Sequence, residues 1–458
     1  PRLKPKEFYD LVVEVAIVRP GPITGGMVHP YLKARERRDR GEAIEYERSS
    51  RDGKEPRLKK ALERTLGIPI FQEQVMEISM IAAGFTATEA DSLRRAMAAW
   101  KRKGGVDKFE ARLKGGMLAN GYSEEFAHRI FEQVKGFGDY GFPESHAYSF
   151  ALLAWSSSWL KCHEPACFLA AMLNSQPMGF YGPSQLIQDA RRHGVPVLPP
   201  DVSHSDWDSQ LEGAMAQPSV RLGLRLVGSL REEAARRIPQ ARQEGPFADT
   251  EDLALRAGLD VQDLAALAAG DALQSLAGHR RQQVWEAVGQ RRAPELLQGA
   301  PIQEEALNLP AAPEGEEIVF DYASMGLTLR RHPLALLRPR LSKLRYLNSE
   351  QLQKLGNGRR ASACGMVTVR QQPATAGGTI FVTIEDETGP VNVIVWQRVR
   401  EQQREPLMHS RLLAVHGTWQ RDEASGGRVC HLLAERLEDL TPLLGRLGRQ
   451  GIRSRDFH

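Results

Sequence analysis

The spacing of apolar residues changes at Ala361, and this change constrains the fold more than any other feature of the sequence. Before Ala361, apolar side chains mostly recur every three to four positions, which is the period of an amphipathic helix. After it, apolar and polar residues alternate, as in "TIFVTIEDETG" and "PVNVIVW". That is the period of a strand with one buried face. The chain therefore has to combine a long helical region with an all-β region.

About five period-two segments follow Ala361, with turn signals between them. Five short strands predict a small closed or nearly closed barrel, for which the OB-fold is the obvious candidate. Such a barrel holds single-stranded nucleic acid by stacking and by contacts in a basic groove. Three aromatic residues are candidate stacking platforms, although each could equally belong to the core: Phe381, Trp396 and Trp419.

The 458 residues suffice for about three domains, and breaks in the helical pattern divide them. Three prolines in "HGVPVLPPDV" interrupt the helices near residue 200, and residues 291–315 have the Pro, Ala, Gln and Glu content of a linker. The fold class is thus multidomain α+β, mostly α-helical before the barrel. The predicted parts are a helical domain at 1–200, a tandem helix–hairpin–helix region at 201–290, a linker with connecting helices at 291–356, the OB-fold barrel at 357–440 and a basic tail at 441–458.

The helix–hairpin–helix prediction depends on a weak internal repeat of helix, glycine turn and basic helix. Backbone N–H groups at such a turn face DNA phosphate without reading the bases. The candidate DNA contacts of this region are Gly228, Ser229, Gly270, Gly278, Arg280 and Arg281.

Basic residues in the helical domain are candidate phosphate contacts. The net charge is only +4, so local clusters matter more than the total. A capping box of Thr86 and Glu89 is expected to open one helix of this domain. Arg94 and Arg95 flank one face of that helix, and Lys101, Arg102 and Lys103 follow at its end. The alternative is a solvated basic face, with the last three residues also complementing the helix dipole.

His146 follows two glycine-rich turns and opens an apolar helix that we expect to run to about Lys161, with Ser145 as its cap. Free N–H groups at a helix N-terminus bind anions, and a partly protonated imidazole would help. The alternative is a plain helix cap.

Metal and disulfide chemistry find little support in the sequence. The four cysteines contain no CxxC pair and are too sparse for a disulfide scaffold, so we expect a reducing cytoplasm. Cys162, His163 and Cys167 fit no common zinc pattern. The carboxylates Glu385-Asp386-Glu387 could hold Mg²⁺, but the following Thr-Gly favours the exposed end of a hairpin. We predict no metal site within the chain.

Membrane association and a targeting segment are not expected. There is no run of about eighteen apolar residues and no signal peptide. The chain opens Pro1-Arg2-Leu3 without an initiator Met, so we expect it to be the interior of a longer protein.

Five motifs in order resemble the bacterial C-family DNA polymerases, the family of the DNA polymerase III alpha subunit. They are "VRPGPITGGMV", "GIPIFQEQVM", "ADSLRRAM", "DYGFPESHAYSFALLAWSSSWLK" and "VPVLPPDV". The likeness is dense over residues 1–205 and weaker through the helix–hairpin–helix and OB regions. "GFPESHAYSF", "SHSDWD" and the end at "SRDFH" further resemble the error-prone, damage-inducible branch.

The resemblance implies roles that the residues alone leave open. Residues 1–200 would be the fingers, and the incoming dNTP phosphates would contact Arg94, Arg95, His146 and Tyr140. The helix–hairpin–helix and OB parts would hold primer-template DNA. The aspartates that hold catalytic Mg²⁺ would lie upstream in the palm, so we expect no catalytic residue here and no polymerisation by this chain alone.

The error-prone branch also implies partners. These are proteins of a mutagenesis cassette and, through them, the sliding clamp. Two alternatives remain open: a portion of the replicative alpha subunit, or a non-catalytic DNA-binding scaffold.

Overall fold

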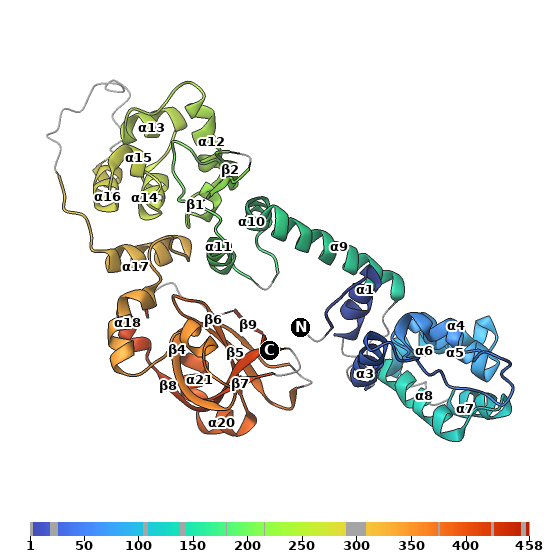
Figure 1. Ribbon diagram of the computed structural model, residues 1–458. Helices are drawn as coiled ribbons and strands as arrows, with labels where there is room; N and C mark the ends of the chain where they lie inside the picture. Colours follow the sequence, from blue (N-terminus) through green and yellow to red (C-terminus); the bar gives the residue numbers. More distant parts are fainter. Residues whose placement is uncertain are drawn as a thin grey trace. The chain divides into compact units, whose positions relative to one another are not determined.

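The computed structural model contains two compact units, Pro1–Ser158 and Trp159–His458, drawn from blue to red along the chain in Figure 1. The structure describes residues 3–18, 26–103, 109–137, 143–179, 181–214, 216–289, 308–373, 376–422, 426–449 and 455–457.

The first unit is helical. Its helices are α1 (Phe8–Ile17), α3 (Val28–Asp39), α4 (Lys59–Leu62), α5 (Gln72–Ala83), α6 (Ala87–Lys103), α7 (Glu110–Ala119), α8 (Glu124–Phe137) and the greater part of α9 (Glu144–His163). One core cluster joins α5, α6, α7 and α8, and a second packs α1 against small residues of α9. The predicted helical character of this region is confirmed.

Two predicted helix starts have different outcomes. Before α6, the Thr86 N–H donates to Glu89 Oε2 over 2.7 Å and the Glu89 N–H donates to Thr86 Oγ1 over 3.2 Å, which is the expected capping box. The start of α9 was predicted wrongly, because Ser145 lies inside its first turn. The helix begins at Glu144, two residues earlier than predicted, because the Pro143 carbonyl already accepts the Ala147 N–H.

The second unit begins with short helices around a small sheet that the sequence did not predict. The first elements are α10 (Pro165–Asn174), α11 (Pro183–Arg192), β1 (Val197–Leu198), β2 (Gln210–Glu212) and β3 (Ser219–Arg221), with the strands in the order β1-β3-β2. The helices that follow are α12 (Glu232–Arg242), α13 (Thr250–Ala257), α14 (Val261–Ala269), α15 (Gln274–Ala277), α16 (Arg280–Gly289), α17 (Glu314–Met325), α18 (Pro333–Lys343) and α19 (Ser349–Gln353).

A barrel completes the second unit, as the period-two pattern predicted. Its elements are β4 (Arg359–Gln371), β5 (Ile380–Glu385), β6 (Pro390–Val395), α20 (Gln397–Gln402), α21 (Arg404–His409), β7 (Leu412–Arg421) and β8 (Cys430–Asp439). The strand order is β5-β6-β8-β7-β4, and pairing of β4 with β5 closes the barrel. β9 (Arg455–Phe457) pairs in parallel with the end of β4. The predicted OB-fold topology is confirmed.

In the part of the chain that the structure describes, no helix combines the length and the apolar character needed to cross a bilayer.

Candidate nucleotide and nucleic-acid sites

Arg94 and Arg95 on α6 share one carboxylate. Arg94 Nη2 lies 2.9 Å from Asp91 Oδ1, and Arg95 Nη2 lies 3.0 Å from Asp91 Oδ2. The two arginine side chains are 40% and 65% exposed. A phosphate at this helix face would therefore compete with Asp91 for both guanidinium groups. Lys101, Arg102 and Lys103 form the last turn of α6, but their side chains lie outside the described residues.

Acidic residues surround the first turn of α9, where an anion was predicted. The Glu144 N–H donates to Glu73 Oε2 over 3.0 Å. The Glu144 carboxylate accepts hydrogen bonds from the Tyr9 hydroxyl over 2.6 Å and from Arg64 over 2.8 Å. Burial and the bond to Glu144 raise the pKa of Tyr9 above its ordinary value. One N–H of the helix start is thus already used, which corrects the expectation of a turn of free donors.

His146 is exposed on the first turn of α9, and its ring lies in a T-shaped arrangement with that of Phe150, with 4.6 Å between the centroids. An anion there would have to be bound mainly by side chains, because Glu73 and Glu144 place negative charge at the helix start. Tyr140, predicted in the same loop, lies outside the described residues.

Sequence reasoning missed an apolar surface on α9. Only two residues of this helix, which the sequence showed to be apolar, are buried: Ala147 and Ala151. Four large side chains of this helix in the first unit are more than half exposed: Tyr148, Leu152, Leu153 and Trp155. Exposed apolar patches of this kind mark contact surfaces.

The first predicted hairpin turn is used for packing. The Gly228 N–H donates to the Ser324 carbonyl of α17 over 2.7 Å, and a Cβ at this position would lie 2.5 Å from the same oxygen. This N–H cannot face a phosphate, which corrects the role predicted for Gly228. Its neighbour Ser229, at φ 65°, remains a candidate.

The glycines of the second predicted turn differ from each other. The Gly270 N–H is bonded to the Ala266 carbonyl, and a Cβ would lie 3.0 Å from Val227, so this glycine allows close packing. The Gly278 N–H is likewise bonded, to the Gln274 carbonyl, but this glycine has φ 71° and open space around it. It connects α15 directly to α16, whose first turn has N–H groups without helical partners. The Gly278 turn is therefore the better candidate for a phosphate contact.

Arg280 and Arg281 are adjacent but have opposite environments. The Arg280 side chain is only 3% exposed and lies 2.6 Å from the Glu317 carboxylate and 2.5 Å from that of Asp321. It cannot reach DNA from there, which corrects its predicted role; sequence patterns could not reveal that α17 supplies two carboxylates. Arg281 is 40% exposed and pairs with Glu316 over 2.8 Å. It remains a candidate DNA contact.

The three aromatic residues of the barrel separate into surface and core. Phe381 is 37% exposed on β5, opposite Ile394 of β6, and Trp396 is 52% exposed directly after β6. Trp419 is 1% exposed and belongs to the barrel core. Its predicted stacking role is wrong, because the alternation along β7 turns this position inward.

The acidic cluster at the end of β5 is structural. Glu385 pairs with Arg192, Asp386 accepts the Ser349 N–H, and Glu387 pairs with Arg338. These contacts use the carboxylates that Mg²⁺ would need, so the cluster does not fit a catalytic metal. No group of three or more His, Cys, Asp or Glu within the described ranges could hold one.

Comparisons with known proteins agree with this architecture. Residues 1–121 match the bacterial DNA polymerase III alpha subunit finger domain, residues 194–283 a helix-hairpin-helix motif and residues 361–440 an OB-fold nucleic acid binding domain. All of the chain aligns with proteins named error-prone DNA polymerase. Identity is 58% for Bordetella bronchiseptica, 57% for Burkholderia pseudomallei and 53% for Alkalilimnicola ehrlichii.

The predicted resemblance to the bacterial C-family DNA polymerases is confirmed, and over its whole length the chain is similar to members of the error-prone branch. The chain spans 43%, 42% and 43% of the lengths of these three relatives. Among solved structures, an asparaginyl-tRNA synthetase from Pyrococcus horikoshii matches 21% of the chain at 25% identity with a TM-score of 0.18. That similarity is too small to carry an argument.

Proposed function

We propose that this chain is the nucleotide- and DNA-binding portion of an error-prone, DNA-directed DNA polymerase that acts in translesion synthesis during DNA repair. The observation that carries the proposal is the 58% identity, over the whole chain, to a protein named error-prone DNA polymerase. The order of finger, helix–hairpin–helix and OB-fold regions supports it. The proposed cellular setting is the cytoplasm, with mutagenesis-cassette proteins and, indirectly, the sliding clamp as partners.

In this proposal the fingers bind the triphosphate of the incoming dNTP. Arg94, Arg95, His146 and Tyr140 contact phosphate oxygens, which positions the substrate and stabilises the charge on the pyrophosphate leaving group. The Mg²⁺ and the aspartates that hold it belong to the part of the relatives' length that this chain does not cover. The chain's own carboxylates do not supply that site, because those at the end of β5 are already paired.

The Gly278 turn, Arg281 and the Phe381–Trp396 face hold DNA in this proposal. The first two contact backbone phosphate, and the aromatic face stacks on bases of a single strand. Because phosphate contacts release counterions, the affinity should fall steeply as salt rises.

The first experiment is primer extension by this chain with Mg²⁺ and dNTPs, beside fluorescence anisotropy with primer-template DNA at two salt concentrations. We expect binding that weakens with salt and no extension. Extension by this chain alone would mean that it contains the catalytic carboxylates, and our division of roles would be wrong. An affinity that does not change with salt concentration would contradict the proposed phosphate contacts.

Asp91 allows a sharper test of the dNTP site. Arg95→Ala, introduced into a full-length relative, should raise the KM for dNTP because it removes a phosphate contact. Asp91→Asn should lower that KM, because it frees Arg94 and Arg95 from their shared carboxylate. Steady-state kinetics of both variants measure these changes in the KM for dNTP. Unchanged KM values in both variants would show that Arg94 and Arg95 do not contact the triphosphate.

The barrel face has a matched pair of aromatic residues for its test. Trp396→Ala should weaken binding of a single-stranded oligonucleotide by about 1–3 kcal/mol, the usual value of one stacked base. Tyr181, 62% exposed in the same unit, is the control, and Tyr181→Ala should leave the affinity unchanged. Anisotropy titrations measure both, and equal losses would argue against stacking at Trp396.

A further inference from the structure

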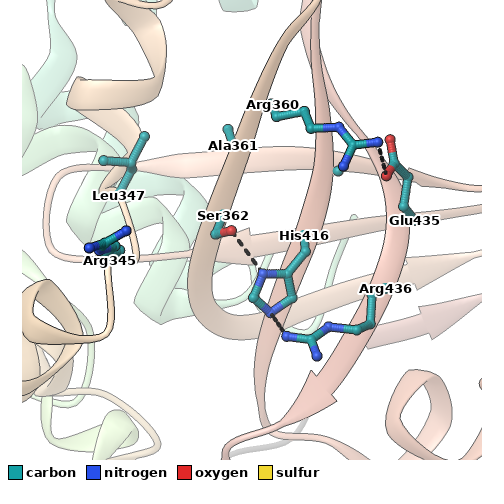
Figure 2. Close-up of a pocket in the computed structure, with 9 residues that line it drawn as sticks. Arg345, Leu347, Arg360, Ala361, Ser362, His416, Glu435 and Arg436 are labelled. Atoms are coloured by element: carbon teal, nitrogen blue, oxygen red, sulfur yellow. Dashed lines mark hydrogen bonds and ion pairs between the residues drawn. The ribbon is translucent and has the colours of Figure 1, made fainter.

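A pocket of about 540 Å³ lies on the side of the barrel formed by β4, β7 and β8. Figure 2 shows its centre, with Ser362 of β4 beside His416 of β7 and with Arg345 and Arg436 on either side of this pair. The central strand, β7, pairs with β4 and β8 and not with β5 or β6. The residues that line the pocket come from β4, β7, β8 and the segment before β4, and they do not include Phe381 or Trp396 of the aromatic face.

A short hydrogen-bonded chain forms the floor of the pocket. Arg436 Nη2 lies 3.0 Å from His416 Nε2, and His416 Nδ1 lies 2.8 Å from Ser362 Oγ. A guanidinium can only donate, so Nε2 accepts and the ring proton is on Nδ1, which donates to Ser362. The Ser362 hydroxyl hydrogen is then free to donate to something else. Burial and the charge of Arg436 lower the pKa of His416, which agrees with a neutral ring.

The backbone around the pocket is shaped for these side chains. The pairing of β7 with β8 shifts between His416 and Gly417, so that Glu435 and Arg436 are both exposed at one bulge. A Cβ on Gly417 would lie 1.8 Å from the Leu433 carbonyl oxygen, so only glycine allows this approach. Bulges re-aim side chains next to functional sites. Here the bulge brings Arg436 to His416.

Three guanidinium groups surround the pocket with little to neutralise them. Arg360 is 86% exposed and meets Glu435 at 3.5 Å, and Arg436 is 65% exposed and meets Glu438 at 3.6 Å. Arg345 has no ion pair among the described residues, and it sits at φ 63°, where side chains other than glycine are uncommon. Three cations thus face two carboxylates, Glu435 and Glu438, which are 49% and 46% exposed.

We propose that this pocket binds a phosphate group, with Arg345, Arg360 and Arg436 as its charged donors and the Ser362 hydroxyl as a neutral donor. Planar guanidinium groups pair with phosphate oxygens in a bidentate way. His416 is a positioning residue that fixes the Ser362 hydroxyl. The pocket is large enough for a phosphate group that is part of a larger molecule, and we propose such a molecule as the ligand. It is either a nucleic-acid backbone or a free polyphosphate.

Two probes distinguish the sources of phosphate: inorganic pyrophosphate measured by calorimetry, and a 12-nucleotide oligo(dT) measured by anisotropy, both with the full 458-residue chain. Arg345→Asn is the main variant, because asparagine tolerates the left-handed backbone and removes the charge. We expect the affinity of this variant for the probe that the pocket binds to fall at least about fivefold. If that probe is the oligonucleotide, the slope of log affinity against log salt concentration should also decrease in magnitude by about one. Arg360→Gln should have the same effect.

Arg404→Ala is the control, because this exposed arginine on α21 lies outside the pocket. Loss confined to pyrophosphate assigns the pocket to a free polyphosphate, and loss confined to the oligonucleotide assigns it to a nucleic-acid backbone. Loss of both supports phosphate recognition without a choice between them. Unchanged affinity for both probes, or equal losses in Arg404→Ala, would overturn the proposal.

Discussion

Adjacent residues of the same type can have unrelated roles, and Arg280 and Arg281 test this. Arg280 is buried between Glu317 and Asp321, where Arg330 adds a second cation. Arg280→Ala should lower the free energy of unfolding by about 3–5 kcal/mol, because it removes the buried partner of Glu317 and Asp321 and leaves Arg330 as their remaining cation. Arg281→Ala removes an exposed pair and should cost at most about 1 kcal/mol.

Urea denaturation of both variants measures this difference in stability. The effects on DNA binding should have the opposite order, with the larger loss in Arg281→Ala. Arg281→Ala should weaken DNA binding and reduce its salt dependence, since it removes a phosphate contact. A folded Arg280→Ala protein with normal stability and weakened DNA binding would show that Arg280 acts at the surface after all.

At the scale of single elements, helix α18 has an unusual cap. The His332 Nδ1 accepts the Leu334 N–H over 3.2 Å, so the ring must stay neutral. Burial lowers the pKa of His332 to about 4, with the carboxylate of Glu387 opposing this and the cations Arg338 and Arg192 adding to it. In the unfolded chain the pKa of a histidine is about 6.5. At pH values between these two pKa values, the histidine is therefore protonated in the unfolded chain but neutral in the folded one, which favours unfolding.

The stability that this cap contributes should be complete above about pH 6.5 and be lost as the pH falls towards about 4, at no more than about 1.4 kcal/mol per pH unit. His332→Asn keeps a capping side chain but does not titrate in this range. Denaturation midpoints at pH 7, 5.5 and 4.5 measure the effect. We expect the variant to lose less stability than the parent chain over this interval, and an identical pH profile would contradict the role of His332.

How far the sequence predicts an element depends on whether its signal is local. The alternation after Ala361 predicted the barrel, and Thr86 with Glu89 predicted a helix start, because the residues that interact lie within one element. The alternation could also have placed Trp419 inside, since it falls on the inward side of β7. The environments of Gly228 and Arg280 could not be predicted, because both depend on α17.

The candidate sites follow the same rule. Arg94 and Arg95 were found from a local basic pattern, but their pairing with Asp91 depends on side-chain geometry that the pattern leaves open. The phosphate pocket draws on Arg345, β4, β7 and β8. These residues are far apart in the sequence and come together only in the folded chain, so no local pattern could have predicted the pocket.

At the scale of the whole molecule, each of the two compact units has its own apolar core. Leu93 is fully buried in a cluster of the first unit, and Leu413 is fully buried in the barrel of the second. Since a chain with more than one compact unit need not unfold in a single step, we expect two cooperative transitions in calorimetry. Replacing either leucine by alanine should cost about 2–5 kcal/mol in the unit that contains it.

The two variants are controls for each other. Leu93→Ala should lower one transition and leave the other in place, and Leu413→Ala should do the reverse. Pyrophosphate or oligonucleotide bound in the barrel pocket should raise only the transition that Leu413→Ala lowers, because a ligand stabilises only the unit that binds it. A single transition that both variants lower equally would mean that the units fold as one, and the separate roles assigned to them would lose their physical basis.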